Sequence, residues 1–102
     1  MTIVEFLSAR LVEAEQAAQA ASPASGPPPR ALAEVEAKRR ILHGYNHAYR
    51  TCLHTLHQAD GSAEANGAWS ALHAWRRALE CLAAIYDDHP DYDPSWKVGV
   101  TS

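Results

Sequence analysis

Residues 29–59 read PRALAEVEAKRRILHGYNHAYRTCLHTLHQA and are predicted to form one helix, roughly 45 Å long. Pro29 suits the first turn of a helix, and Gly61 suits the position just after the last turn. Gly44 lies in the middle of the segment, where glycine costs about 1 kcal/mol relative to alanine, so we expect a kink there. One side of the helix carries apolar residues at helical spacing: Val35, Ile41, Leu42, Tyr45, Ala48, Tyr49, Cys52, Leu53 and Leu56.

A shorter helix is predicted over residues 3–21. Thr2 and Glu5 have the spacing of a capping box, in which each side chain accepts a hydrogen bond from the other residue's backbone N–H. Residues 22–29 follow as a proline-rich linker, because proline excludes the preceding residue from helical geometry. The helix has one apolar stripe, which thins toward its C-terminal end: Ile3, Leu7, Leu11, Ala14, Ala18 and Ala21.

A third helix is predicted at about residues 64–87. Residues 88–102 are expected to be irregular, with Tyr92 and Trp96 anchoring them to the helices. We expect the tryptophans of this helix to pack in the core or between the helices of the hairpin, whereas an exposed Trp69 or Trp96 would anchor an interface. The apolar residues of the helix fall in one narrow arc, with two further residues close by: Leu72, Trp75, Leu79, Leu82 and Tyr86, with Ala68 and Trp69.

The alternation typical of strands is missing from the sequence, so the predicted fold is all-α. We expect a long antiparallel helical hairpin, formed by residues 29–59 and 64–87, with the helix over 3–21 packed against it. The whole chain, residues 1–102, is predicted to form a single domain, since it is too short for two.

The composition excludes several classes of protein. Hydrophobic residues make up 47% of the 102 residues, charged residues 21%, and the formal net charge is −3, which predicts a soluble globular chain. Much of the apolar fraction is alanine, so we expect a thin core that self-association would supplement. The sequence has neither a membrane-length apolar run nor a secretory signal, which favours a cytoplasmic protein.

The two cysteines, Cys52 and Cys81, are predicted to be free thiols. If the hairpin turns around residues 62–64, Cys52 lies level with about residue 74. The remaining offset of roughly 10 Å along the helix axis exceeds the separation that a disulfide tolerates.

Three segments resemble a known family: TIVEFLSARLVEAE (2–15), PRALAEVEAKRRIL (29–42) and LECLAAIYDDHPDYDPSW (79–96). The family consists of small uncharacterised proteins of actinobacteria and their phages, classed as a domain of unknown function. The resemblance implies a phage or mobile-element accessory role and brings no catalytic residues. Many members of that family hold cysteines that suggest a zinc site, but residues 60–76 contain no cysteine, so that site is not carried over.

Four histidines of the long helix, His43, His47, His54 and His57, share an arc of about 80° away from the apolar side. His43 and His47 are four residues apart, and His54 and His57 three, so either pair can hold one zinc or nickel ion weakly. The further ligands expected for such a site are acidic tail residues: Asp87, Asp88 and Asp91. The alternative is a solvated polar face that happens to be rich in histidine.

Arg39, Arg40 and Arg50 lie in the same arc, and residues 35–58 carry a net charge of +3 between acidic ends. Self-recognition between this basic face and the acidic tail is one interpretation, nucleic-acid binding is a second, and a solvated face is the third. A pI near 6.0 argues against nucleic acid. Arg39 or Arg40 is also expected to lie opposite Asp87 and Asp88, whose charges are unfavourable at a helix C-terminus. The predicted binding surface therefore joins two groups: Arg39, Arg40 and Arg50 with Asp87, Asp88, His89 and Trp96.

Catalysis has little support in the sequence. Glu34 and Glu36 fall on different faces of a helix, and Cys52 points to the apolar side while His54 points away. We therefore expect a non-enzymatic helical protein that acts through protein contacts or in regulation, as a homodimer. Metal binding through a histidine pair is the main alternative, and binding of nucleic acid is the weaker one.

Overall fold

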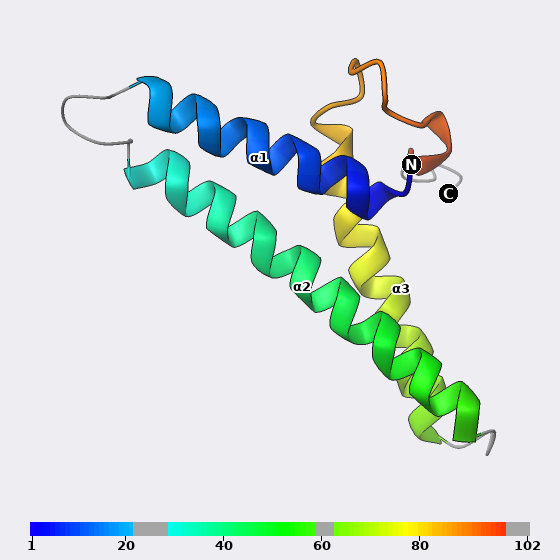
Figure 1. Cartoon of the computed structure of the whole chain (residues 1–102). Coiled ribbons are helices and arrows are strands. Elements are labelled where there is room, and N and C mark those ends of the chain that lie inside the picture. The colour runs from blue at the N-terminus through cyan, green and yellow to red at the C-terminus, as the bar shows by residue number, and fades with distance from the viewer. Residues whose placement is uncertain (22–28, 59–62, 98–102) are drawn as a thin grey trace.

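The computed structural model describes residues 1–21, 29–58 and 63–97, which form three α-helices and one short 3₁₀ helix (Figure 1). These are α1 (Ile3–Ala21), α2 (Pro29–Gln58), α3 (Ala63–Ala84) and η1 (Pro94–Trp96). No strand occurs among the described residues, so the predicted all-α fold is confirmed. None of the described helices is long and apolar enough to cross a membrane.

The helix boundaries agree with the sequence prediction except at the end of α3. The helix ends at Ala84 instead of near residue 87. The backbone N–H groups of Ile85, Tyr86 and Asp87 each donate to the carbonyl three residues earlier, at 2.9–3.3 Å, so the chain tightens into turns. Residues 22–28 of the predicted linker lie outside the described part of the chain, and its last residue, Pro29, already begins α2.

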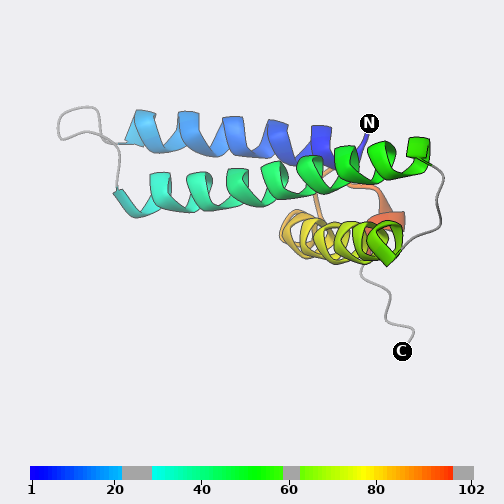
Figure 2. The same cartoon turned by 90° about the horizontal axis from the view of Figure 1, so that it is seen from below.

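The three helices are arranged around α2, the longest of them. α1 runs antiparallel along the N-terminal part of α2, and α3 runs back along the C-terminal part until it meets the beginning of α1 (Figures 1 and 2). The Cα radius of gyration is 16.6 Å, whereas a compact chain of this length has about 13 Å. The elongated shape arises because three helices meet only near the middle of α2, and two-helix arms extend on either side.

The core lies where the three helices meet. Phe6 of α1 and Leu79 of α3 are fully buried there. The core joins residues of all three helices and of η1: Ile3, Phe6, Leu7, Leu11, Val35, Leu42, Leu79, Ala83 and Trp96.

The predicted capping box at the start of α1 is present. The backbone N–H of Thr2 donates to Oε1 of Glu5 at 2.7 Å, and the N–H of Glu5 donates to Oγ1 of Thr2 at 3.1 Å. The hydrogen bond from the Thr2 backbone holds the pKa of Glu5 below its ordinary value. The start of α1 is therefore fixed locally, as its sequence predicts.

Gly44 admits a tryptophan where a kink was expected. A Cβ atom placed on Gly44 would lie 2.3 Å from the ring of Trp75, and α2 continues as one helix through this position. Gly44 therefore lets α3 approach α2 closely and sets their register. Cys52 donates from its Sγ to the carbonyl of Ala68 at 3.1 Å, so it lies beside residue 68 and not residue 74 as predicted. Both cysteines are free, as expected, with Cys52 buried and Cys81 exposed.

The segment after α3 folds over the beginning of α1, with Phe6 at the centre of four rings. The ring centroids of Tyr86, His89, Tyr92 and Trp96 lie 5.0–6.2 Å from that of Phe6. Asp93 caps η1 by accepting a hydrogen bond from the N–H of Ser95 at 2.9 Å, which lowers the pKa of the Asp93 carboxyl. The predicted anchoring by Tyr92 and Trp96 is therefore correct.

Candidate interaction surface

One apolar line along α2 is covered at one end and bare at the other. Val35, Leu42, Tyr49 and Leu56 follow each other at intervals of seven residues, which places them near one line on a helix. Val35 and Leu42 are 4% and 5% exposed, because α1 packs on them. Tyr49 and Leu56 are 47% and 54% exposed, because α1 does not extend along the C-terminal part of α2 (Figure 1).

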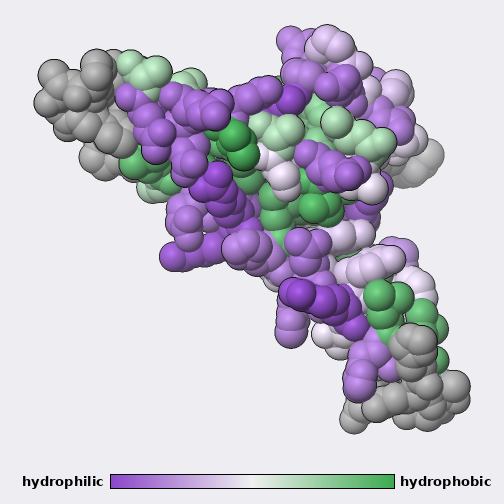
Figure 3. All heavy atoms as spheres, viewed as in Figure 1, coloured by the Kyte–Doolittle hydropathy of each residue, from purple (hydrophilic) through white to green (hydrophobic). Residues whose placement is uncertain are grey.

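The bare end belongs to what we call the distal arm, residues 45–58 of α2 and 63–75 of α3. Three exposed apolar side chains of α2 and one of α3 form what we call the distal patch: Tyr49, Leu53, Leu56 and Trp69. These four are a majority of the large hydrophobic residues that are exposed in the described chain, and hydrophobic atoms are visible at the surface of this arm in Figure 3.

Three residues of the distal patch, Tyr49, Leu56 and Trp69, lie along the same edge of the α2–α3 contact, and Leu53 lies next to Tyr49 and Leu56 on α2. The opposite edge is marked by a hollow of about 230 Å³ lined by His47, Thr51, Ala71 and Trp75, among others. At 100° per residue, Tyr49 and Leu56 lie across the contact line from His47, and Trp69 lies across it from Ala71. Because His47 of α2 and Ala71 of α3 line the same hollow, the residues across the contact from them share the other edge. Trp69 of α3 therefore extends the patch that begins on α2.

Charge is sparse in the sequence around the distal patch. Between Ile41 and Trp75 the chain has only three charged residues, Arg50, Asp60 and Glu64, whereas residues 29–40 have six. Depletion of charge together with enrichment of tyrosine and tryptophan is typical of the centre of protein–protein interfaces. The distal arm therefore differs from an ordinary solvated helix pair.

The basic residues singled out from the sequence are largely engaged in ion pairs. Nη1 of Arg39 donates to Oε2 of Glu15 on α1 at 2.8 Å, and Arg40 lies 3.5 Å from Glu36 within α2. The hydrogen bond from Arg39 lowers the pKa of the Glu15 carboxyl, and Glu15 in turn raises the pKa of Arg39. Arg39 thus fastens α1 to α2, which corrects the prediction that it faces the acidic tail. Arg50 is exposed on the distal arm.

The cation beside the tail is Arg10 of α1, a residue that sequence analysis missed. Arg10 is 7% exposed, its guanidinium lies 5.1 Å from the ring centroid of Phe6, and Nη2 donates to Glu13 at 3.0 Å. Nη1 of Arg10 contacts Nε2 of His89, while the N–H of Asp91 donates to Nδ1 at 3.0 Å. The spacing of Phe6 and Arg10, four residues apart beside the main stripe of α1, was the available signal for a second buried face.

The tail residues of the predicted binding surface differ in their exposure. Asp87 and Asp88 are exposed, but His89 is half-buried against α1 and Trp96 is 4% exposed in the core. Placing Trp96 on a binding surface was wrong, because its ring packs against Phe6. Trp69, expected in the core, is instead 43% exposed.

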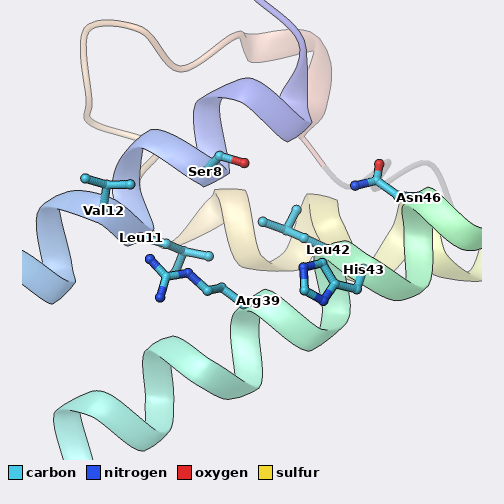
Figure 4. A pocket seen from close by; sticks show the side chains of 7 residues that line it. All are labelled: Ser8, Leu11, Val12, Arg39, Leu42, His43 and Asn46. Atoms are coloured by element: carbon cyan, nitrogen blue, oxygen red, sulfur yellow. The ribbon is translucent and has the colours of Figure 1, made fainter.

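The histidines of α2 do not line one common site in the described part of the chain. His43 lines a cleft of about 210 Å³ between α1 and α2 with Arg39, Ser8 and Asn46 (Figure 4). His47 lines the hollow between α2 and α3, and His54 is exposed. His57 lies on α2, but its side chain is outside the described part of the chain.

The residues that the structure describes contain no group of three or more His, Cys, Asp or Glu side chains placed to share a metal ion. No third side chain among these residues completes a site for a histidine pair such as His43 with His47. Polar and apolar side chains line both depressions, and Arg39 of the cleft is engaged by Glu15.

The model of DUF6221, a family of unknown function, matches residues 1–98, and the chain belongs to that family. The resemblance to a domain of unknown function is thereby confirmed. Comparison with curated proteins and with solved structures finds no match.

Proposed function

We propose that this member of a family without an assigned function is a non-enzymatic protein that acts through contacts with protein, and that the distal patch is the contacting surface. The observation that carries the proposal is the apolar line on α2. Its covered half, Val35 and Leu42, already packs against a helix, and its bare half, Tyr49 and Leu56, has the same spacing. A helix laid along the bare half would bury it as α1 buries the other half.

The distal patch has the chemistry of a contact surface. Leucine provides apolar area, and burying such area is favourable by about 25 cal/mol per Å². Tyr49 and Trp69 belong to the residue types that dominate binding energy at protein interfaces. Tyr49 also stacks on Tyr45, with ring centroids 6.2 Å apart, so its ring is positioned before a partner arrives.

The finer expectations from the sequence are part of the same proposal. An actinobacterial or phage origin, an accessory or regulatory role and a cytoplasmic location would suit a small protein that works by association. The two free thiols agree with a reducing compartment. Nucleic-acid binding through Arg39, Arg40 and Arg50 is less favoured, since the first two are paired with Glu15 and Glu36.

The proposal is tested by replacing the apolar centre of the patch with charge. We expect the wild-type protein either to associate or, as a monomer, to bind the apolar dye ANS at the patch. The double variant Leu53→Lys/Leu56→Lys should lose whichever property is found, while Val12→Lys keeps it. Val12 is a matched control, because it is 46% exposed on α1 and lies outside the patch. Light scattering gives the mass, and dye fluorescence gives the exposed surface.

Two outcomes would contradict the proposal. One is a compact wild-type monomer that binds no dye. The other is an association or a dye signal that the double variant retains as fully as the Val12→Lys control. Circular dichroism and thermal melting establish that all three proteins are folded, which is expected because the replaced side chains are exposed.

A further inference from the structure

We infer that the distal patch is covered by the distal patch of a second copy of this chain, with the two α2 helices antiparallel about a twofold axis near Leu53. The inference rests on the proposed function and specifies its partner. It follows from three features of the distal arm: its lack of a large buried core, its sparse charge, and the arrangement of its apolar residues.

The distal arm lacks large, fully buried side chains among its described residues. Its buried side chains there are Ala48 and Cys52, both small, and the larger Leu72 and Trp75 are only partly covered. Helices in proteins owe most of their stability to packing of an apolar face, and a pair of helices with a small core gains little. A second layer of helices on the patch would supply the missing burial.

Sparse charge makes the arm compatible with a second copy of itself. An identical partner presents the same charges, so a strongly charged surface repels its own copy. In residues 45–58 of α2 the charged residue is Arg50, and the apolar line of Tyr49 and Leu56 contains none. Two copies can therefore approach along this line without placing like charges at its centre.

The spacing within the patch is close to symmetric about its centre. Tyr49 precedes Leu53 by four residues, and Leu56 follows it by three. In an antiparallel pair Tyr49 of each copy then lies beside Leu56 of the other, and Leu53 meets its own equivalent. Contacts that exchange in this way are what a twofold interface requires. With α3 beside each α2, the two arms form a four-helix bundle, and Trp69 lies at its edge.

Charge complementation at Leu53 is the test. Leu53→Lys and Leu53→Glu are each expected to weaken self-association at least 100-fold, because the axis then holds two like charges. An equimolar mixture of the two variants should restore a dimer with an affinity within about tenfold of the wild-type value. The matched pair Val12→Lys and Val12→Glu should dimerise as the wild type does. Native mass spectrometry resolves the lysine and glutamate chains and counts each in the complex.

A cross-link provides a second readout of the same axis. In a Cys52→Ser/Cys81→Ser background, Leu53→Cys is expected to join two copies under mild oxidation, and Val12→Cys is not. The cross-linked species should keep the circular dichroism spectrum of the wild-type protein. Absence of the cross-link would contradict the position of the axis.

The outcomes separate this inference from the proposed function. A wild-type monomer that binds ANS at the patch overturns the dimer and leaves the patch as a surface for a different protein. A dimer that persists in both Leu53 variants places the contact elsewhere and overturns both proposals. Loss of the dimer in each variant without recovery in the mixture overturns the antiparallel arrangement.

Discussion

The two halves of α2 carry the same apolar spacing and have different neighbours. In the first half Val35 and Leu42 lie under α1, and the surrounding surface is rich in charge. In the second half Tyr49 and Leu56 are about half exposed, and charge is nearly absent from the sequence around them. A surface in contact with water usually carries charged residues. The second half of α2 lacks them and exposes large apolar side chains, so it resembles a helix face that packs against another element.

Truncation of equivalent residues in the two halves is the strongest way to separate them. Leu42→Ala should lower the free energy of unfolding by about 2–5 kcal/mol, because it opens a cavity under α1. Leu56→Ala should cost less than about 1 kcal/mol in dilute protein, because that side chain is 54% exposed. Urea unfolding at low concentration measures both values. Equal losses would mean that the second half is buried within the monomer.

Gly44 offers a test of the contact that forms the distal arm. Gly44→Ala should destabilise the protein by about 1–3 kcal/mol, since the added methyl group overlaps the Trp75 ring, despite alanine's better helix propensity. Gly67→Ala is the matched control. It lies on α3 with no atom within 4 Å of the new Cβ, so it should stabilise the protein by about 0.5–1 kcal/mol. Thermal melts of both variants would decide, and a stabilising Gly44→Ala would contradict the close approach.

The ion pair that fastens the first half predicts a pH dependence. Because Arg39 lowers the pKa of Glu15, the pair stabilises the folded protein above the ordinary pKa of glutamate. That contribution is lost as the pH falls through the lowered pKa. Glu15→Gln should therefore lower the melting temperature at pH 7 and match the wild type in strong acid. Glu36→Gln, which breaks only the exposed pair with Arg40 inside α2, should have a smaller effect at pH 7.

Metal binding by the histidines is the smallest expected effect. If His43 and His47 hold zinc or nickel weakly, His43→Ala/His47→Ala should abolish uptake measured by native mass spectrometry. His73→Ala is the control, because His73 lies on α3 against Trp69. Uptake that is unchanged in the double variant would reject this pair as ligands. The ANS signal of the distal patch should be unaffected in the His43→Ala/His47→Ala protein.

Local signals in the sequence predicted the helices well, and contacts between helices were harder to predict. The capping box fixed the start of α1 because both partners lie within four residues. The end of α3 was placed three residues too late, since the turns that follow it continue the helical path with hydrogen bonds that span three residues instead of four. The register of α2 and α3 was wrong because it depends on Trp75 packing at Gly44, a contact between distant residues.

The candidate site shows the same limit. Periodicity correctly gave α2 an apolar side, but it could not show where α1 stops covering that side, so Tyr49, Leu53 and Leu56 were not distinguished from Val35 and Leu42. For a similar reason Trp69 was expected in the core, and Trp96, which was predicted to anchor the C-terminal segment, was also placed on the binding surface. Trp96 is buried because Phe6 gathers the rings of the C-terminal segment around it, whereas Trp69 has no such centre beside it.

The most direct test of the account is native mass spectrometry of the untagged wild-type protein beside the Leu53→Lys/Leu56→Lys variant, over a series of concentrations. We predict a complex of twice 11.1 kDa for the wild type that forms as concentration rises, and only the single mass for the variant. A dimer of equal strength in both proteins would contradict the claim that the bare half of α2 is the contacting surface.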